Sequence, residues 1–346
     1  MKTWKPMAIW SLCIALLAGC GGGKAGGTAA PATGPQAVTP VQAYGFLHVC
    51  GNRICSQAGQ PVQLRGMSLF WSNTGWGGER FYDARTVATL ASDWHATVVR
   101  AAMGVEENGG YLASDAANRA RVRVVVDAAI ARGIYVIVDW HAHGLHQPEA
   151  EAFFGEMARA YARVPNLIWE TYNEPKRQDW SGELKPYHEA VIRKIRAAGS
   201  KNLVVVGSPT WSQDVDVAVL DRIKSDDNVA YALHFYAYSH KKDLRDRADD
   251  AMKRGIALLV TEYGTCHSSG NGNFDPVESK RWADWMDANQ ISSANWSLND
   301  KPETASALVP GASASGPWPD DQLTESGKWA RAYVAAGASA PAATAP

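Results

Sequence analysis

The sequence is short of the features that mark nucleic-acid and nucleotide binding. Its 346 residues carry a formal net charge of -1 and contain no long basic run that could neutralise a phosphate backbone. No glycine-rich phosphate loop follows the first predicted β-strand, residues 62–69. No second module with an apolar core of its own is visible at either end. We therefore expect one main domain and no nucleic-acid partner.

Cysteine is also scarce, with five residues in the chain. Cys50 and Cys55 flank a Gly-Asn turn, which can bring two thiols together across a β-hairpin. We favour a disulfide between them with Cys266 free, although spacing alone leaves a bridge from either one to Cys266 open. A disulfide would require an oxidising compartment.

Long apolar runs are absent except near the N-terminus, where one extends from Met7 to Leu17 behind two lysines. Residues 1–20 have the layout of a secretory leader and are too short to remain as a membrane span. Their ending resembles a bacterial lipobox, in which cleavage before Cys20 exposes a thiol that is acylated. An ordinary leader with an incidental cysteine is the alternative. We expect an extracytoplasmic protein, either secreted to the cell surface or lipid-anchored, with the outer membrane favoured because Gly21 rather than Asp follows Cys20.

Two further segments contain little that could be buried. Residues 21–41 and 337–346 consist largely of Gly, Ala, Pro and Thr, which predicts a flexible linker and a disordered tail. Residues 42–336 are left as the single folded domain.

This domain alternates short β-branched runs with stretches of helical periodicity. The predicted strands are residues 62–69, 97–103, 135–141, 167–174, 203–208, 229–235, 257–262 and 292–298, and the clearest helices are 119–132, 150–163, 184–198, 243–254 and 277–289. Strands that lack clean alternation and are joined by helices indicate a parallel sheet buried on both faces. Eight repeats predict an α/β fold closed into a (β/α)8 TIM barrel, here with a short N-terminal β-hairpin. A doubly wound open sheet is the less favoured alternative.

Polar side chains stand where several predicted strands end, at the barrel face that carries TIM-barrel active sites. They are Arg100, Asp139, His141, Asn173, Glu174, His234, Tyr236 and Glu262. Burying them without a task would cost stability. Glu174 and Glu262 suit glycoside hydrolysis, in which one carboxyl protonates the leaving oxygen while the other attacks or activates water. A salt bridge to a neighbour such as Arg100 explains either glutamate alone, but it explains the pair poorly.

Four ordered motifs carry a family resemblance. Trp169-Glu-Thr-Tyr-Asn-Glu-Pro175, His234-Phe-Tyr236, Thr261-Glu-Tyr-Gly264 and Asn295-Trp-Ser-Leu298 resemble those of glycoside hydrolase family 5, of the bacterial endoglucanase type. The similarity extends from about residue 45 to residue 334. It implies a monomeric endo-β-1,4-glucanase, or cellulase, that acts on β-1,4-glucan polysaccharides by a retaining double displacement, without a cofactor or metal.

The same resemblance assigns roles to the strand-end residues. Glu174 corresponds to the acid/base and Glu262 to the nucleophile, so we expect Glu262 to be ionised while Glu174 stays protonated. Arg100 and Tyr236 are expected to orient Glu262, and Asn173 to bind the sugar 2-hydroxyl. His141 and His234 complete the hydrogen-bonded floor of the site.

Tryptophan is abundant, with 14 residues. Trp71, Trp76, Trp211 and Trp296 lie at strand ends or in the loops that follow, where an indole can stack on a pyranose ring. By the resemblance, Lys301 and Glu303 contact sugar hydroxyls; on their own they look like solvated charges.

The sequence leaves three other interpretations open. Asp139, His141, His143 and His146 could be metal ligands, but no further ligands complete such a site, and we expect no metal. The enzyme could instead be an endo-β-mannanase or a xyloglucan-cleaving relative. From another class, it could be a non-catalytic surface glycan-binding lipoprotein.

Overall fold

The computed structural model describes residues 38–337. The predicted leader with Cys20, most of the predicted linker and the tail from residue 338 lie outside the described residues. Helix α1 (Pro40–Tyr44) begins inside the predicted linker. It does so because Thr39 and Gln42 form a capping box around Pro40, which suits the first helical position. Between residues 38 and 337 no helix is both long and apolar enough to cross a bilayer.

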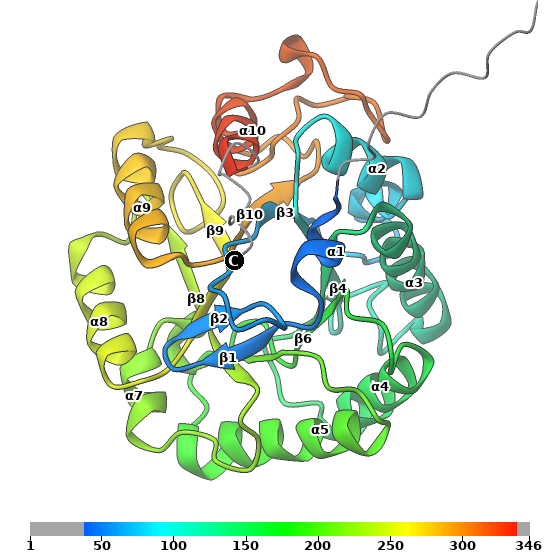
Figure 1. The fold of residues 1–346 in the computed structure, drawn as a ribbon. Helices are drawn as coiled ribbons and strands as arrows, with labels where there is room; N and C mark the ends of the chain where they lie inside the picture. The colour runs from blue at the N-terminus through cyan, green and yellow to red at the C-terminus, as the bar shows by residue number, and fades with distance from the viewer. Residues whose placement is uncertain (1–37, 338–346) are drawn as a thin grey trace, which may run out of the picture. The chain divides into compact units, whose positions relative to one another are not determined.

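Eight parallel strands form a closed barrel in the order β10-β3-β4-β5-β6-β7-β8-β9 (Figure 1). Their bounds are β3 (Arg65–Leu69), β4 (Val98–Gly104), β5 (Tyr135–His141), β6 (Leu167–Glu170), β7 (Val204–Val206), β8 (Val229–Tyr236), β9 (Leu258–Gly264) and β10 (Ser293–Leu298). Each strand falls within or overlaps one predicted run. The predicted TIM barrel is therefore confirmed.

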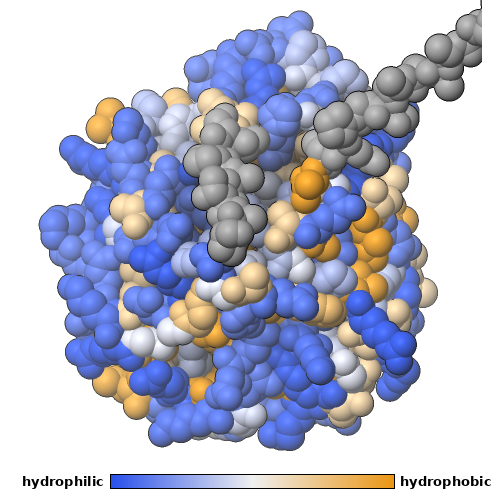
Figure 2. All heavy atoms as spheres, in the orientation of Figure 1, coloured by the Kyte–Doolittle hydropathy of each residue, from blue (hydrophilic) through white to orange (hydrophobic). Residues whose placement is uncertain are grey.

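Helices surround the barrel (Figure 1). The long ones are α2 (Ala84–Ser92), α3 (Asp115–Arg132), α4 (Gln147–Ala160), α5 (Lys185–Ala197), α8 (Lys242–Lys253), α9 (Pro276–Asn289) and α10 (Glu325–Ala336), and shorter turns are η1 (Gly78–Phe81), η2 (Trp180–Leu184), α6 (Pro209–Ser212), α7 (Val215–Leu220) and η3 (Asp320–Gln322). The outer surfaces of α5 and α8 are predominantly hydrophilic (Figure 2). Their inner faces pack on the strands in one large apolar cluster.

A second apolar cluster fills the barrel interior at the amino ends of the strands. It contains Tyr135, Ile137 and Leu259 from the barrel wall, together with Leu47 and Ile54 from the N-terminal segment. Tyr135 and Ile137 are at most 1% exposed. This end of the barrel is thus packed shut, and the opposite end is left for a binding site.

The predicted N-terminal hairpin covers that packed end. Strands β1 (His48–Cys50) and β2 (Arg53–Cys55) pair antiparallel across the barrel opening in Figure 1. Cys50 and Cys55 are joined by a disulfide, with Cα atoms 6.0 Å apart. Cys266 is buried and has no cysteine partner in the part of the chain that the structure describes. The bridge favoured from the spacing is therefore the one present.

One strand is shorter than predicted, and its end matters for the site. Strand β6 stops at Glu170 rather than at residue 174. Beyond it, the Asn173 amide donates to the Trp140 carbonyl (3.1 Å) and the Glu174 amide to the Ala142 carbonyl (3.3 Å). The backbone after β6 therefore leans towards β5, and this holds Asn173 and Glu174 at the mouth of the barrel.

Candidate active site

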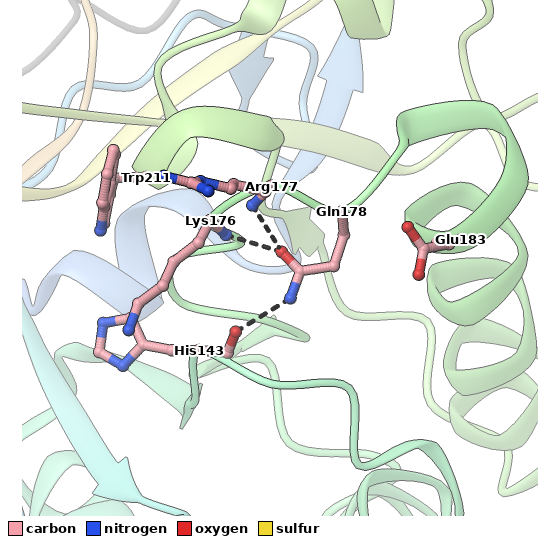
Figure 3. A pocket seen from close by; sticks show the side chains of 6 residues that line it. All are labelled: His143, Lys176, Arg177, Gln178, Glu183 and Trp211. Carbon is pink, nitrogen blue, oxygen red and sulfur yellow. Dashed lines mark hydrogen bonds between the residues drawn. The ribbon is translucent and has the colours of Figure 1, made fainter.

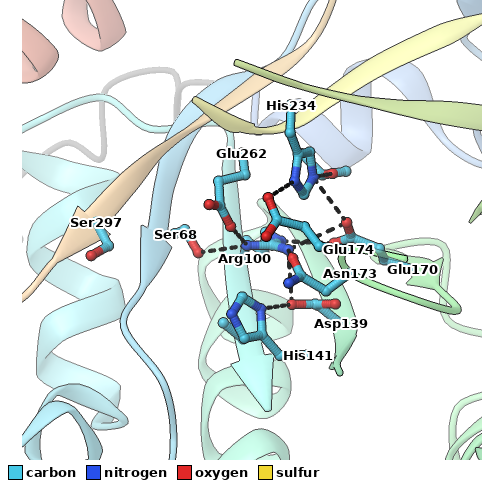
Figure 4. A network of polar contacts seen from close by, with 12 residues as sticks. Ser68, Arg100, Asp139, His141, Glu170, Asn173, Glu174, His234, Glu262 and Ser297 are labelled. Carbon is cyan, nitrogen blue, oxygen red and sulfur yellow. Dashed lines mark hydrogen bonds and ion pairs between the residues drawn. The ribbon is translucent and has the colours of Figure 1, made fainter. Parts of the chain in front are cut away.

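A single buried arginine lies at the centre of the polar network at the carboxyl ends of the strands (Figure 4). The Arg100 guanidinium contacts Glu170 (Nε to Oε2, 2.7 Å), Glu262 (Nη1 to Oε2, 2.9 Å) and Asp139 (Nη2 to Oδ2, 2.9 Å). It also donates to Asn173 Oδ1 at 2.6 Å. Burial alone would lower the pKa of Arg100, but the attraction of the three carboxylates outweighs it and raises the pKa. Arg100 is therefore a fixed positive charge.

Asp139 and Glu170, two of the acidic partners of Arg100, differ in the protonation state that they favour. Burial and the repulsion from Glu170 and Glu262 raise the pKa of Asp139 well above its usual range, although Arg100 opposes this. Burial also acts to raise the pKa of Glu170, but the attraction of Arg100 dominates and the pKa is lowered. Asp139 therefore favours its neutral form, and Glu170 its charged form.

Glu170 was not identified from the sequence. It is fully buried and accepts two hydrogen bonds from Arg100. The sequence feature that could have identified Glu170 is the one that identified Glu174: an acidic residue in the apolar stretch that begins at Leu167. Because it stands mid-run rather than at a run end, its position in the sequence does not mark it as a site residue.

Glu262, on β9, is held at both oxygens. Its Oε1 accepts a hydrogen bond from the Tyr236 hydroxyl at 2.8 Å, and its Oε2 accepts one from Arg100. It is 4% exposed. Burial raises the pKa of Glu262, and the nearby charge of Glu174 adds to this effect. The carboxylate is thus oriented with little rotational freedom.

Glu174 lies between two histidines. Its Oε1 is 3.0 Å from His234 Nδ1, and its Oε2 is 3.5 Å from His143 Nε2. His234 Nε2 in turn lies 2.8 Å from the Thr261 hydroxyl. The Glu174 side chain is 15% exposed, so one edge faces the cleft.

These contacts favour an ionised Glu174 in the free site, whereas the sequence led us to expect a protonated one. Burial acts to raise the pKa of Glu174, but hydrogen bonds to His143 and His234 outweigh it and lower the pKa to about 2. Burial acts to lower the pKa of His234, but hydrogen bonds to Glu170 and Glu174 raise it to about 9. The Glu174–His234 pair therefore holds one proton, and in the free site these shifts favour its location on the His234 imidazole.

The two glutamates approach closely. One carboxylate oxygen each of Glu174 and Glu262 and one ring nitrogen of His234 all lie within 4.8 Å of one another. These atoms could also hold a cation, but both glutamates already have protein partners in Arg100, Tyr236 and His143. The geometry therefore presents two carboxylates to a shared space.

The alternative histidine cluster does not converge on one point. His141 Nδ1 lies 2.7 Å from Asp139 Oδ2, and burial lowers the pKa of His141, which keeps it neutral. His143 and His146 instead contact Glu106, which also accepts hydrogen bonds from the backbone of the 143–144 segment. No pattern in the loop that carries Glu106 pointed to this contact. Glu106 fixes the loop that brings His143 to Glu174.

Three of the predicted tryptophans lie near one another, around His141. The ring centroids of Trp71 and Trp76 are 5.5 Å apart, and Trp71 meets the His141 imidazole edge-on at 4.2 Å. The Trp296 indole stacks parallel to the same imidazole at 5.1 Å. Trp76 is 40% exposed, whereas Trp296 is nearly buried, so Trp76 offers the more accessible ring.

Lys301 and Glu303 extend this aromatic wall. Lys301 Nζ forms an ion pair with Glu303 Oε2 at 2.7 Å and lies 5.4 Å from the centre of the Phe70 ring. Phe70 in turn packs against Trp296. The structure therefore places Lys301 over Phe70, one ring away from Trp296, with Glu303 paired to it, which the sequence without the resemblance did not indicate.

Trp211 lies elsewhere, in a cavity of about 500 Å³ next to His143 (Figure 3). The cavity is lined by His143, Lys176, Arg177, Gln178, Glu183 and Trp211. Trp211 is 43% exposed and presents its indole to this space. Three of the four predicted sugar-stacking tryptophans thus lie around His141, and Trp211 lies apart from them in the cavity next to His143.

The comparisons with known proteins agree with this arrangement. The family model described as Cellulase (glycosyl hydrolase family 5) matches residues 55–302. Endoglucanase Z of Dickeya dadantii (strain 3937) is 50% identical over 291 residues, which cover 83% of this chain and 66% of that protein. An endoglucanase of Clostridium saccharobutylicum is 39% identical over 299 residues, which cover 84% and 65%. The chain therefore spans just under two thirds of the length of these curated relatives.

Solved structures show the same similarity. A structure from Cytophaga hutchinsonii superposes with a TM-score of 0.83 at 50% identity and covers 86% of this chain and 96% of that chain. The catalytic domain of Thermobifida fusca endoglucanase Cel5A superposes at 0.80 with 32% identity and covers 86% and 99%. An E355Q variant of that domain has been solved in complex with cellotetraose.

Proposed function

Because this chain belongs to glycoside hydrolase family 5, the cellulase family, we propose that it is a retaining endo-β-1,4-glucanase. Its substrate is then cellulose or a soluble β-glucan, cleaved at internal β-1,4-glucosidic bonds by double displacement. The endoglucanase names of its relatives support this assignment.

The spacing of the two glutamates carries the proposal. Retaining glycosidases hold their carboxyl groups about 5 to 5.5 Å apart, whereas inverting enzymes leave about 6.5 to 9.5 Å for a water molecule. The closest oxygens of Glu174 and Glu262 lie within 4.8 Å. This short separation matches the retaining class rather than the inverting one, so direct attack by a carboxylate is the favoured chemistry.

In the first step Glu262 attacks the anomeric carbon, and the bond to the leaving oxygen breaks as that oxygen takes a proton from Glu174. Tyr236 and Arg100 hold the two Glu262 oxygens, so the attacking atom is positioned before the sugar binds. The product is a glycosyl ester on Glu262 with inverted configuration.

The proton for this step comes from the Glu174–His234 pair. In the free site it is on His234, 3.0 Å from Glu174 Oε1. A glycosidic oxygen beside Glu174 and the exclusion of water both favour a neutral carboxyl, so the proton moves to Glu174 when substrate binds. The expectation of a protonated Glu174 thus applies to the substrate complex rather than to the free enzyme.

In the second step Glu174, now ionised, takes a proton from water as the water attacks the anomeric carbon. The ester bond breaks, Glu262 is released as a carboxylate, and the second inversion restores the original configuration. The site then holds the same charges as at the start.

Asn173 supports the transition state through an unpaired group. Its Oδ1 accepts a hydrogen bond from Arg100, whereas its buried Nδ2 has no hydrogen-bond partner among residues 38–337. An unpaired buried amide is costly unless a ligand satisfies it. A sugar 2-hydroxyl at Asn173 would do so, and this contact strengthens as positive charge develops on the ring.

Product stereochemistry and substrate choice test the function together. We expect proton NMR of cellotetraose hydrolysis to show the β-anomer first, with the α-anomer appearing only by mutarotation. We also expect carboxymethylcellulose to be cleaved faster than mannan or xyloglucan. Initial release of the α-anomer would exclude the retaining mechanism, and inactivity on carboxymethylcellulose would exclude the cellulase assignment.

The pH profile tests the shared proton. The pair holds one proton below the His234 pKa of about 9 and none above it, so kcat/KM should fall as the pH rises through about 9. At low pH kcat/KM should fall as Glu262 takes a proton, at a pH above the ordinary range of a glutamate because its pKa is raised. In His234→Gln the basic limb should move to lower pH, since Glu174 alone must then hold the proton. An unmoved limb would show that His234 does not share it.

The alternatives receive less support. A mannanase or xyloglucan-cleaving enzyme could use the same two glutamates, but the relatives are named endoglucanases. A non-catalytic glycan-binding protein would not need Glu262 fixed by Arg100 and Tyr236 at a cost in desolvation.

We further propose that the enzyme works outside the cytoplasm, tethered by acylated Cys20. The apolar run before Cys20 supports a leader, and the Cys50–Cys55 disulfide suits an oxidising compartment. The outer membrane is the favoured location and a monomer the favoured state.

A further inference from the structure

Two positive side chains line the cavity next to the acid/base without any acidic partner. Lys176 and Arg177 are exposed, and neither side chain forms an ion pair or hydrogen bond within residues 38–337. Most other cations near the site are paired, as Arg100 and Lys301 are. The one acid in the lining, Glu183, stands at the far end from Trp211 and accepts a hydrogen bond from the Asp179 amide (Figure 3). The cavity thus carries an excess of one positive charge.

The loop that carries these cations is fixed. The Gln178 side chain accepts hydrogen bonds from the backbone amides of Lys176 (2.7 Å) and Arg177 (3.1 Å) and donates to the His143 carbonyl (3.0 Å). Figure 3 shows Lys176 extending towards His143, and Arg177 extending towards Trp211. The backbone from which both side chains project is therefore fixed beside the cavity.

The cavity lies on the leaving-group side of the scissile bond, a statement that rests on the function proposed above. His143, in its lining, contacts Glu174, the residue that protonates the leaving oxygen. Neither partner of Glu262, Arg100 or Tyr236, belongs to the lining. A sugar in this cavity would therefore belong to the departing half of the chain.

We propose that this cavity binds a carboxylate-bearing sugar, such as a glucuronate unit, so that the enzyme prefers acidic β-1,4-glucans on its leaving-group side. Trp211 offers an indole face for the pyranose ring. Arg177 can bind a carboxylate through two parallel hydrogen bonds, and Lys176 adds a mobile point charge. A neutral glucan could stack on Trp211 and accept hydrogen bonds from the two cations, but it would leave both without an opposite charge.

Matched oligosaccharides test the preference. The probes are cellotetraose and two derivatives in which one or the other of the two reducing-end units is oxidised at C6 to glucuronate. For the wild type we expect kcat/KM to be about fivefold higher for at least one acidic probe than for cellotetraose, because exposed charge contacts are each modest. The preference should shrink towards parity in roughly 0.5 M NaCl, since salt screens such contacts.

Variants locate the effect. The quantity compared is the ratio of kcat/KM for the preferred acidic probe to kcat/KM for cellotetraose. In K176Q/R177Q this ratio should fall to about one, and in K176E/R177E it should fall below one. R193Q/K201Q removes the same charge from two exposed residues outside the cavity lining, one on α5 and one just after it, and its ratio should equal that of the wild type. The ratio is measured within one preparation, so partial unfolding of a variant does not alter it.

The outcomes separate this inference from the proposed function. A wild-type ratio near one, or a K176Q/R177Q ratio equal to that of the wild type, would overturn the acidic preference while cleavage of cellotetraose leaves the glucanase assignment intact. Failure of the folded wild type to cleave any of the three probes would overturn the assignment itself.

Discussion

Glu262→Gly should lower kcat on cellotetraose by roughly 10⁴- to 10⁶-fold, the range seen when a covalent nucleophile is lost. Without the carboxylate no glycosyl ester can form, and Arg100 and Tyr236 are left pointing at an empty space. The measurement is reducing-sugar release at substrate saturation. Glu262→Gln should be equally inactive although it keeps the side-chain volume, because an amide does not attack the anomeric carbon.

Added azide gives the nucleophile prediction a stereochemical readout. In Glu262→Gly an azide ion can occupy the vacated space and attack from the face opposite the leaving group, while Glu174 still supplies the proton. With an activated β-cellobioside as substrate, the product should be the α-glycosyl azide. A β-product, or wild-type activity in either variant, would show that another residue is the nucleophile.

Glu174→Gly should have the second largest effect, a fall in kcat/KM of roughly 10²- to 10⁴-fold on natural glucans. The leaving oxygen then departs without a proton, so the loss should nearly vanish for a dinitrophenyl cellobioside, whose leaving group needs none. The measurement is the comparison of the two substrates. An equal loss on both would indicate that Glu174 acts in binding or folding rather than as the acid.

Azide should again rescue this variant, but with the opposite product. In Glu174→Gly the ester on Glu262 forms first, and azide then attacks it from the other face, which gives the β-glycosyl azide. The contrast between α- and β-azides distinguishes the two glutamates without reference to rates. Thr210→Ser, near the cavity but outside the Glu174–Glu262 contacts, provides a control that should show no azide product.

The sequence predicted those features for which a residue pattern is compatible with only one structure. The apolar runs predicted all eight barrel strands, because a parallel strand buried on both faces tolerates little else. Glu174 and Glu262 stood out because each ends such a run. The hairpin followed from a Gly-Asn turn between two cysteines.

The remaining features depend on contacts between distant residues. Glu170 could be assigned only once Arg100, 70 positions away, was seen to bond both its oxygens. Glu106 lies in a loop with no pattern, and its contacts with the 143–144 segment are tertiary. The protonated form predicted for Glu174 is not the one that the free site favours, because the sequence cannot show that His234 lies 3.0 Å away.

The position of Arg100 links catalysis to the assembly of the barrel. Its guanidinium on β4 contacts Ser68 on β3, as well as Asp139 on β5, Glu170 on β6 and Glu262 on β9. Ser68 on β3 and Glu262 on β9 lie far apart in the sequence, so the network is complete only when these distant segments have come together. Turnover of a substrate molecule therefore reports that β3, near the start of the described chain, and β9, in its last third, have been brought to the same arginine.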